Sequence, residues 1–398
     1  MPTKDATVYA RRQAKLKELE SLLAGRRVAL VHEYLTVPGG SEQVFRVFSE
    51  LLPQATIFTA LFDRSRFAWL DARRVKTSVL DRWPWLRKHH QLIVPLLPWI
   101  TEQHDLRGYD LVLSDSHIAA HGVITPTETI HLNYCHTPIR YVWYPQIDPR
   151  MQSPWFAPLR NYLRRYDLAA STRPDGYIAN SQTVAKRIFE RYGRRAEVIT
   201  PPVLSLIESE SQTNNAVVDT LKLPPRSYFL LVTRLIDYKL PELVIDSCQK
   251  LGLPLIIIGR GPLAKQIKAK LQPSSILIEE HISNDLLAEY YRQAKALIFM
   301  ANEDFGLVAA EAQSYGTPVI GYRLGGISEI VEAGVTGELV EKQDLESLSS
   351  VLELFDDSRY DRELIRQQAT KFSRENFEIA IIDYIIESIN QIRSQRWN

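Results

Sequence analysis

Two glutamates in the second half of the chain are spaced in a way that suits the binding of a polar ligand. Glu303 follows the apolar run 296–300, and Glu311 comes eight residues later. A short apolar run predicts a buried strand of a parallel sheet, and ligands of α/β folds bind outside the carboxyl ends of such strands. Glu303 is therefore expected at a binding edge. Glu311, on the helix that follows, can accept hydrogen bonds from sugar hydroxyls.

The turn between the two glutamates can bind an anion. Phe305, Gly306 and Leu307 are expected to form the first turn of a helix that ends at Gly316. The amides of a first turn have no partner within the helix, and the helix dipole adds partial positive charge. An anion and the Glu303 carboxylate can then bind one ligand from two sides. The alternative for this segment alone is a surface helix with two solvated acids.

Cations and paired glycines follow other predicted strands. Arg234 and Lys239 come after the run 228–233, and an arginine fork beside a lysine point charge suits a diphosphate. Gly39 and Gly40 follow the first predicted strand and begin a helix, where a backbone without side chains can approach phosphate or sugar closely. Each feature has a simpler explanation, such as a tight turn or an ion pair. Together they favour one phosphate-bearing ligand.

A glycine pattern later in the chain allows a different interpretation. Gly259 and Gly261 belong to a G-x-G-x-x-A sequence that follows a strand, and Glu279 lies 20 residues beyond Gly259. This matches the dinucleotide fingerprint, which would imply a nicotinamide or flavin cofactor. The pattern falls on the second strand of its domain, however, whereas the fingerprint occupies the first. A phosphate-bearing ligand near this loop is the favoured interpretation.

Short apolar runs alternate with helical stretches along the whole chain. This alternation predicts an α/β protein with two doubly wound, Rossmann-like parallel sheets. The predicted strands are 28–32, 56–59, 110–114, 130–134, 176–179 and 196–200 in the first series, and 228–233, 255–259, 276–279, 296–300 and 318–321 in the second.

The same pattern divides the chain into four parts. Residues 1–26 are expected to be a helical extension, 27–204 the first domain and 205–376 the second. The polar stretch at 205–225 is typical of a linker or surface loop. The last part, 377–398, has phenylalanine and isoleucine at helical spacing, so one face of this helix must be buried, and we expect it to return to the first domain.

Composition excludes several classes of protein. The 398 residues carry 48 Lys+Arg and 47 Asp+Glu, and this near-neutral balance argues against a nucleic-acid partner. Cys135 and Cys248 are too few for a disulfide scaffold or a zinc site. No apolar stretch reaches the roughly 20 residues that a spanning helix needs, and the first 25 residues do not look like a signal peptide. The expected location is the cytoplasm.

At this point the chain resembles the retaining GT-B glycosyltransferases of family 4, and within them the mannosyltransferase branch typified by O-antigen enzymes. The resemblance covers about residues 27–390. Its motifs, in chain order, are PGGSEQV (38–44), YCHTPIRYVW (134–143), ANS (179–181), TRLIDYK (233–239), GRGP (259–262) and the Glu303–Glu311 segment.

The resemblance implies that a nucleotide-sugar donor lies in a cleft between the domains, held mainly by the second. Arg234 and Lys239 match the cations that neutralise the diphosphate, and Glu303 matches the acid that faces the donor sugar. Glu311 matches the ribose-binding acid, and His136 the first-domain histidine that contacts the donor sugar near the reacting carbon. Catalytic roles thus fall to His136 and Glu303, and donor binding to Gly39, Gly40, Arg234, Lys239, Gly259, Gly261, Phe305, Gly306, Leu307 and Glu311.

No metal and no other cofactor is expected. The chain contains no D-x-D triplet, the pair that holds Mg²⁺ or Mn²⁺ on a diphosphate in metal-dependent sugar transfer. Arg234, Lys239 and a helix N-terminus can supply the positive charge instead. Because no carboxylate qualifies as a covalent nucleophile, retention is expected from attack on the same face of an oxocarbenium-like centre.

The first domain departs from its branch on the acceptor side. Tyr144 follows Trp143 where the branch has an acid, and His121 stands where it often has lysine. Residues 64–107 also carry an excess of five positive charges interleaved with four tryptophans. Such a stretch suits peripheral contact with an anionic membrane surface that presents a lipid-linked acceptor. The alternative is a solvated face whose tryptophans complete the core.

The leading hypothesis is a retaining transferase that moves a hexose, expected to be mannose from GDP-mannose, to a glycan or lipid-linked acceptor in polysaccharide biosynthesis. A UDP-sugar donor is the alternative within the same class. A catalytically silent paralogue that serves as a binding subunit is the alternative from another class, and a nicotinamide oxidoreductase comes last.

Overall fold

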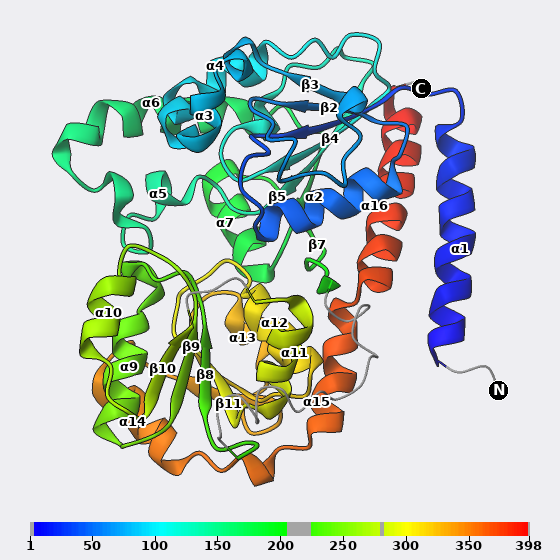
Figure 1. Ribbon diagram of the computed structural model, residues 1–398. Helices are drawn as coiled ribbons and strands as arrows, with labels where there is room; N and C mark the ends of the chain where they lie inside the picture. Colours follow the sequence, from blue (N-terminus) through cyan, green and yellow to red (C-terminus); the bar gives the residue numbers. More distant parts are fainter. Residues whose placement is uncertain (1–3, 205–223, 279–281, 397–398) are drawn as a thin grey trace. The chain divides into compact units, whose positions relative to one another are not determined.

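The chain divides into two units, each built on its own parallel sheet. A computed structural model describes residues 4–204, 224–278 and 282–396 (Figure 1). The first unit comprises residues 1–202 and 374–398, and the second comprises residues 203–373. The boundaries expected from the sequence were 204 and 376. Most of the predicted linker, residues 205–223, lies outside the described residues.

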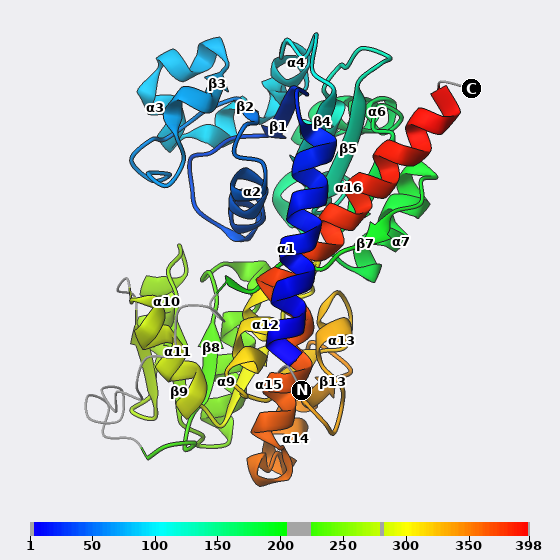
Figure 2. The ribbon, with the colours of Figure 1, turned by 90° about the vertical axis from the view of Figure 1, so that its right-hand side faces the viewer.

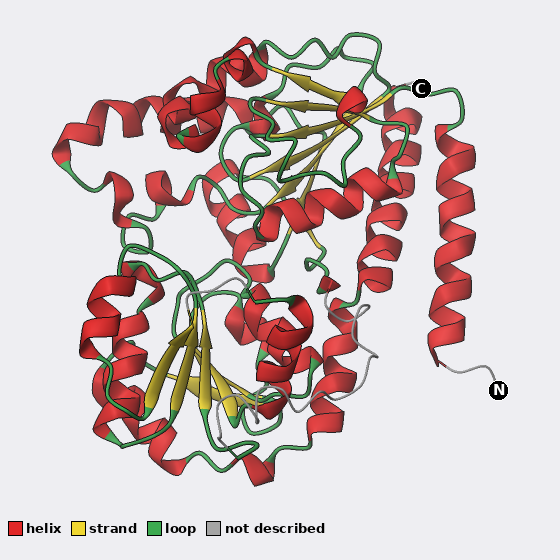
Figure 3. Cartoon of the chain, in the orientation of Figure 1, coloured by secondary structure: helices red, strands yellow, loops and turns green. Residues whose placement is uncertain are grey.

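The first unit is built on a seven-stranded parallel sheet in the order β3-β2-β1-β4-β5-β6-β7. Figure 3 draws the strands of both units in yellow and the helices in red. Its strands are β1 (Val28–His32), β2 (Thr56–Thr59), β3 (Val75–Thr77), β4 (Leu111–Ser116), β5 (Ile130–Cys135), β6 (Gly176–Ala179) and β7 (Glu197–Val198). Its helices are α1 (Lys4–Leu23), α2 (Gly40–Leu51), α3 (Pro84–Lys88), α4 (Leu97–Glu102), α5 (Arg140–Trp143), α6 (Ala157–Ala170), α7 (Gln182–Tyr192) and α16 (Arg374–Arg396).

The second unit has a six-stranded parallel sheet in the order β10-β9-β8-β11-β12-β13. Its strands are β8 (Phe229–Val232), β9 (Leu255–Ile258), β10 (Ser275–Ile278), β11 (Ala296–Phe299), β12 (Val319–Tyr322) and β13 (Gly337–Val340). Its helices are α9 (Pro241–Lys250), α10 (Ala264–Lys270), α11 (Asn284–Gln293), α12 (Leu307–Ser314), α13 (Ile327–Ile330), α14 (Leu345–Leu354) and α15 (Arg362–Ala369).

Every strand predicted from the sequence is present, and two strands were missed. β3 reads Val-Lys-Thr and is largely exposed, so it lacks the apolar run that identified the others. β13 reads Gly-Glu-Leu-Val and also lacks a continuous apolar run. β4 continues two residues beyond its predicted end, through Asp115 and Ser116, because these buried polar side chains find partners on neighbouring strands.

Both sheets reverse their strand order once, and the reversal marks a ligand edge. In the first sheet β1 lies between β2 and β4, and in the second β8 lies between β9 and β11. At such a switch point the connections leave in opposite directions, so the carboxyl ends of the two central strands border a crevice. The residues that follow β1, β4, β8 and β11 are therefore the first candidates for ligand binding.

The two terminal helices pack together in the first unit (Figure 2). The apolar face predicted for the last helix is buried, including Phe377, Ile381 and Ile385, and Tyr384 Oη donates to the carbonyl of Tyr177. α1 covers another side of α16 through ion pairs, among them Lys15 with Asp383 at 2.8 Å. The N-terminal extension thus completes the first unit.

Among the described residues, no helix is long and apolar enough to span a bilayer.

Candidate functional site

An ion pair joins two of the predicted site residues at the switch point of the second sheet. Glu303 follows β11, and Lys239 ends the short helix η8 (Asp237–Lys239) after β8. The Lys239 ammonium contacts the Glu303 carboxylate, and the two side chains are 11% and 21% exposed. The pair thus keeps a partly desolvated cation and acid at an edge that a ligand can reach.

The backbone next to Lys239 adopts an unusual conformation. Leu240 has φ +53°, in the left-handed region that residues other than glycine rarely enter, and Pro241 begins α9 directly after it. This bend ends η8 at Lys239. Arg234, on the same connection, is exposed, and its guanidinium donates to Tyr238 Oη at 3.2 Å.

The glycines of the G-x-G pattern pack against the connection that carries Arg234. A Cβ built on Gly259 would lie 1.9 Å from the carbonyl oxygen of Thr233, and one on Gly261 would lie 2.3 Å from that of Leu235. The Leu235 amide also donates to the carbonyl of Arg260 at 2.8 Å. Close packing of two loops is therefore a sufficient reason for both glycines. The acid of the dinucleotide fingerprint, Glu279, lies outside the described residues.

The turn before α12 is fixed by glycine and by a buried ring. α12 begins at Leu307, two residues later than predicted, because Gly306 has φ +103° and serves as its N-cap. Phe305 is buried, with its ring centroid 5.5 Å from that of Phe372. A Cβ on Gly326 would lie 2.4 Å from the Phe305 Cα, so the glycine lets the next loop pack directly on this turn. The first-turn amides of α12 are thereby held beside Glu303.

Glu311 lies on α12 in a poorly solvated place. Its Oε2 accepts a hydrogen bond from Tyr291 Oη at 3.2 Å, and Tyr291 stacks on Tyr315. Burial raises the pKa of Glu311 from 4.5 to about 7, and the Tyr291 hydrogen bond opposes this rise only in part. An acid held in this state gains a great deal when a ligand donates hydrogen bonds to it.

We expect Glu311→Gln to stabilise the protein at pH 8 by about 2 kcal/mol and to have little effect at pH 5. Because the pKa of Glu311 is higher in the folded than in the unfolded chain, Glu311 takes up a proton on folding between these two pKa values. The wild-type free energy of unfolding therefore falls as pH rises from about 4.5 to about 7. Urea unfolding at both pH values measures the effect, with Glu353→Gln at an exposed position as control. An equal change at the two pH values would contradict this prediction.

In the first unit, His136 forms a short hydrogen bond to an acid that the sequence did not point to. His136 follows β5, its side chain is 13% exposed, and its Nε2 lies 2.6 Å from Asp115 Oδ1. Gly39 is the N-cap of α2 and Gly40 its first residue, both exposed after the first strand. These three predicted residues thus lie on connections at the carboxyl edge of the first sheet.

A second acid near this edge, Glu33, binds the loop that follows β4. Oε1 of the buried Glu33 accepts hydrogen bonds from the amides of residues 117–120 at 2.8–3.1 Å. Burial would raise the pKa of Glu33, but the charge of His117 and these amides hold it well below the usual range. Glu33 could have been found from the sequence, because it is a polar residue that directly follows a buried strand, β1.

The two departures from the resembled branch are both buried. The Tyr144 ring lies 4.8 Å from the Arg187 guanidinium carbon and 5.0 Å from that of Arg191. An aromatic face thus meets two cations where the branch places an acid. His121 stacks on Tyr192 beside Asp167, and burial lowers the pKa of His121 to about 4. Both side chains take part in packing within the first unit.

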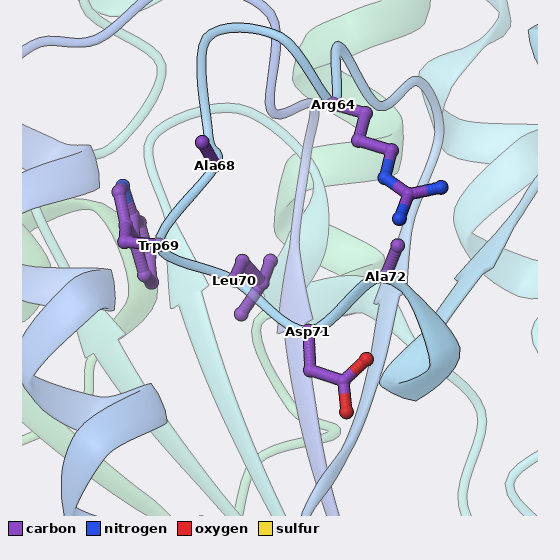
Figure 4. A pocket seen from close by; sticks show the side chains of 6 residues that line it. All are labelled: Arg64, Ala68, Trp69, Leu70, Asp71 and Ala72. Atoms are coloured by element: carbon purple, nitrogen blue, oxygen red, sulfur yellow. The ribbon is translucent and has the colours of Figure 1, made fainter.

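A surface pocket of about 430 Å³ lies apart from these residues (Figure 4). It lies in the connection between β2 and β3, and none of the predicted site residues lines it. Arg64, Ala68, Trp69, Leu70, Asp71 and Ala72 form its walls. Within the described ranges, no three His, Cys, Asp or Glu side chains are arranged to hold a metal ion.

Most of the second unit is similar to one known protein family. The family described as "Glycosyl transferases group 1" matches residues 216–372. The likeness to this family therefore covers the greater part of the second unit. The matched region contains Arg234, Glu311 and the Lys239–Glu303 pair at the second switch point.

Curated relatives and solved structures agree with this placement. A D-inositol 3-phosphate glycosyltransferase of Thermomonospora curvata is 29% identical over 242 residues, which are 54% of this chain and 56% of the relative. One from Streptosporangium roseum is 31% identical over 205 residues, covering 46% and 47%. The chain thus spans about half the length of the curated relatives it matches.

The solved structures extend the likeness of fold to nearly the whole chain. Anabaena HepE in complex with UDP-glucose has a TM-score of 0.65 at 17% identity, covering 91% of this chain and 99% of that one. Sucrose-phosphate synthase of Thermosynechococcus elongatus has a TM-score of 0.68 at 17% identity, covering 92% and 100%. The expected fold class, GT-B with two Rossmann-like parallel-sheet domains, is confirmed.

Proposed function

We propose that the chain is a glycosyltransferase that moves a hexose from a nucleotide-sugar donor to a glycan or lipid-linked acceptor. The observation that carries this proposal is the Lys239–Glu303 pair, which lies at the second switch point beside the N-terminus of α12. A cation, an acid and a row of amides at one edge suit a sugar diphosphate. The group 1 match over the same residues supports the proposal.

Each residue has a defined role in the proposed reaction. Arg234 and Lys239 neutralise the diphosphate and stabilise the charge that builds as it leaves. Glu303 accepts hydrogen bonds from hydroxyls of the transferred sugar, and Glu311 binds the ribose. His136 contacts the sugar near the reacting carbon. The backbones of Gly39, Gly40, Gly259, Gly261, Phe305, Gly306 and Leu307 line the donor.

The proposed donor is GDP-mannose, and the alternative is a UDP-sugar, which the UDP-glucose complex of Anabaena HepE favours by analogy. Calorimetric titration with GDP, UDP, GDP-mannose, UDP-glucose and NAD separates these cases. We expect one sugar nucleotide to bind at least tenfold more tightly than the others, and Arg234→Ala to weaken that binding. Binding of NAD with no response to any sugar nucleotide would overturn the proposal.

Activity is distinguished from a silent binding subunit by donor hydrolysis in the absence of acceptor. Wild type should hydrolyse the donor, and Glu303→Ala should lower the rate about 100-fold because the sugar loses its acidic partner. Binding of a sugar nucleotide without hydrolysis or transfer would favour the silent paralogue. The anomeric configuration of the product tests retention, and an inverted product would contradict it.

We also propose that transfer needs no metal. The cations Arg234 and Lys239, with the helix N-terminus, take the place of a divalent ion on the diphosphate. EDTA should leave the rate unchanged within about twofold. Loss of transfer that Mg²⁺ restores would contradict this expectation.

We propose peripheral docking on an anionic membrane through an exposed apolar face of the first unit. Leu86, Ile93, Leu97 and Ile100 anchor α3, α4 and the intervening turn η3 (His90–Leu96) in the core. Five other apolar side chains of this stretch are 46–61% exposed, so its tryptophans do not complete the core. They are Trp83, Trp85, Leu92, Leu96 and Trp99, the tryptophan face.

Vesicles test the docking proposal. Arg82 and Lys88 are exposed among these side chains, and such cations favour anionic headgroups. Co-sedimentation with phosphatidylglycerol vesicles should fall at least fivefold in a Trp83→Ser, Trp85→Ser, Trp99→Ser variant. Trp155→Ser, at an exposed tryptophan outside this face, is the matched control. Equal binding by the two variants would refute the docking surface.

A further inference from the structure

A buried row of alternating acids and histidines runs through the first unit to His136. Asp115 bridges two imidazoles: its Oδ1 lies 2.6 Å from His136 Nε2, and its Oδ2 lies 3.0 Å from His32 Nδ1. His32 Nε2 in turn lies 3.4 Å from Glu42 Oε1. We call His136, Asp115, His32 and Glu42 the histidine–acid row.

The register of the sheet produces this row. His32 ends β1 and is paired with Asp115 of β4, so their side chains leave the sheet at the same level. His136 comes directly after β5, the next strand along, and its amide donates to the carbonyl of Ser116. Glu42 lies in the first turn of α2, which follows β1. The row therefore joins the ends of β1 and β4 to the connections that follow β1 and β5.

The charges within the row fix where the protons are. Both ring nitrogens of His32 face carboxylates, so both carry protons: burial would lower the pKa of His32, but Asp115 and Glu42 raise it well above its usual range. Burial would raise the pKa of Asp115 as well, but its interactions with His136 and His32 hold that pKa below its usual range. An ionised carboxylate only accepts hydrogen bonds, and so His136 Nε2 must be the donor to Oδ1.

We propose that Asp115 is a positioning residue that keeps a His136 ring proton on Nε2, so that His136 Nδ1 is left to accept a hydrogen bond from a hydroxyl of the donor sugar. This deepens the role of His136 and rests on the proposed function. Nδ1 has no hydrogen bond among the described residues, and the side chain is partly exposed. A second nitrogen fixed as an acceptor would bind a hydroxyl without a change of tautomer.

At the other end of the row, Glu42 lies against Gly39 at the start of α2. Glu42 Oε2 accepts a hydrogen bond from Ser41 Oγ at 2.9 Å, and a Cβ on Gly39 would lie 2.9 Å from the same oxygen. The row thus positions two elements with proposed donor contacts, His136 at one end and the Gly39–Gly40 backbone at the other. Burial excludes His32 and Asp115 themselves from contact with a ligand.

The tautomer can be measured without substrate. In protein labelled with ¹⁵N at histidine, long-range ¹⁵N–¹H correlation identifies which ring nitrogen is protonated, with His136→Gln to assign the signal. We expect the Nε2–H form in wild type. Asp115→Asn should shift His136 to a mixture of forms, because an amide cannot accept from both imidazoles. Asp167→Asn, at another buried aspartate of the same unit with its own Trp143 and Tyr192 donors, should leave the His136 signal unchanged.

An Nδ1–H signal for His136 in wild type, or no change in Asp115→Asn, would overturn the inference. Failure of the proposed function gives a different result: the tautomer is then as expected, yet His136→Gln leaves hydrolysis of GDP-mannose and UDP-glucose unaffected.

Kinetics separate positioning from simple structural support. If Asp115 acts through His136, Asp115→Asn and His136→Gln should each lower kcat for the hydrolysed donor 10- to 100-fold, and the double variant should be no slower than the slower single variant. Losses that multiply in the double variant would show that Asp115 acts independently of His136 and would refute the positioning role.

Discussion

Lys239→Ala should lower kcat/KM for the proposed sugar transfer by about 10²- to 10³-fold, the expected cost of removing one charged group that stabilises a transition state. Lys239 is the cation in contact with Glu303, and it lies on a connection whose backbone bends at Leu240 to end η8 beside β11. In the proposed reaction the leaving diphosphate would then keep Arg234 and the N-terminus of α12, and Glu303 would lose its cationic partner. Steady-state kinetics with the donor identified by titration measures the loss.

Two controls accompany this prediction. Lys265→Ala removes an exposed lysine of the same unit and should change kcat/KM less than twofold. Lys239→Arg keeps the charge but not the compact ammonium, so we expect an intermediate loss. A loss below tenfold in Lys239→Ala would show that the ion pair has no part in the reaction.

A double-mutant cycle then tests whether Lys239 and Glu303 act as a unit. Because the two side chains are in contact, loss of one changes the surroundings of the other. The combined loss in Lys239→Ala, Glu303→Gln should be smaller than the product of the single losses. Full multiplicativity would mean that the pair seen in the structure is separated when the donor binds.

The sequence predicted the fold because the two sheets consist of apolar runs buried on both faces. The runs at Val28–His32 and Leu255–Ile258 were read correctly for this reason. β4 was cut short at Ser114, because Asp115 satisfies its charge through side chains on β1 and after β5 that no local pattern reveals. The histidine–acid row was missed as a consequence.

The candidate site was predictable in part. The order of the motifs predicted that Arg234, Lys239 and Glu303 lie at one edge of the sheet. It did not predict the contact between Lys239 and Glu303, because the backbone next to Lys239 has a left-handed Leu240, a conformation that residues other than glycine rarely adopt. The sequence also could not predict that the side chains of the tryptophan face are exposed to solvent. Buried and exposed side chains alternate there along short helical turns, and composition is the same for a core and for a docking surface.

Gly259→Ala should destabilise the second unit by about 3 kcal/mol or more, even though it adds one methyl group. The added Cβ would lie 1.9 Å from the Thr233 carbonyl oxygen, a backbone atom that cannot rotate away as a side chain does. Either β9 or the connection after β8 must shift. Because that connection carries Arg234 and Lys239, donor affinity should fall together with stability.

Gly252→Ala separates this steric cost from the ordinary cost of replacing glycine. Gly252 has φ +65° with no atom within 4 Å of a built Cβ, so alanine there should cost only about 1 kcal/mol and leave donor binding unchanged. Urea unfolding and donor titration of both variants measure the two effects. If Gly259→Ala lost donor affinity while keeping full stability, its carbon would obstruct the ligand itself, and the glycine would then be a donor contact as the resemblance implies. Loss of both, with Gly252→Ala near wild type, would instead assign Gly259 to the packing that holds the two cations at the edge of the sheet.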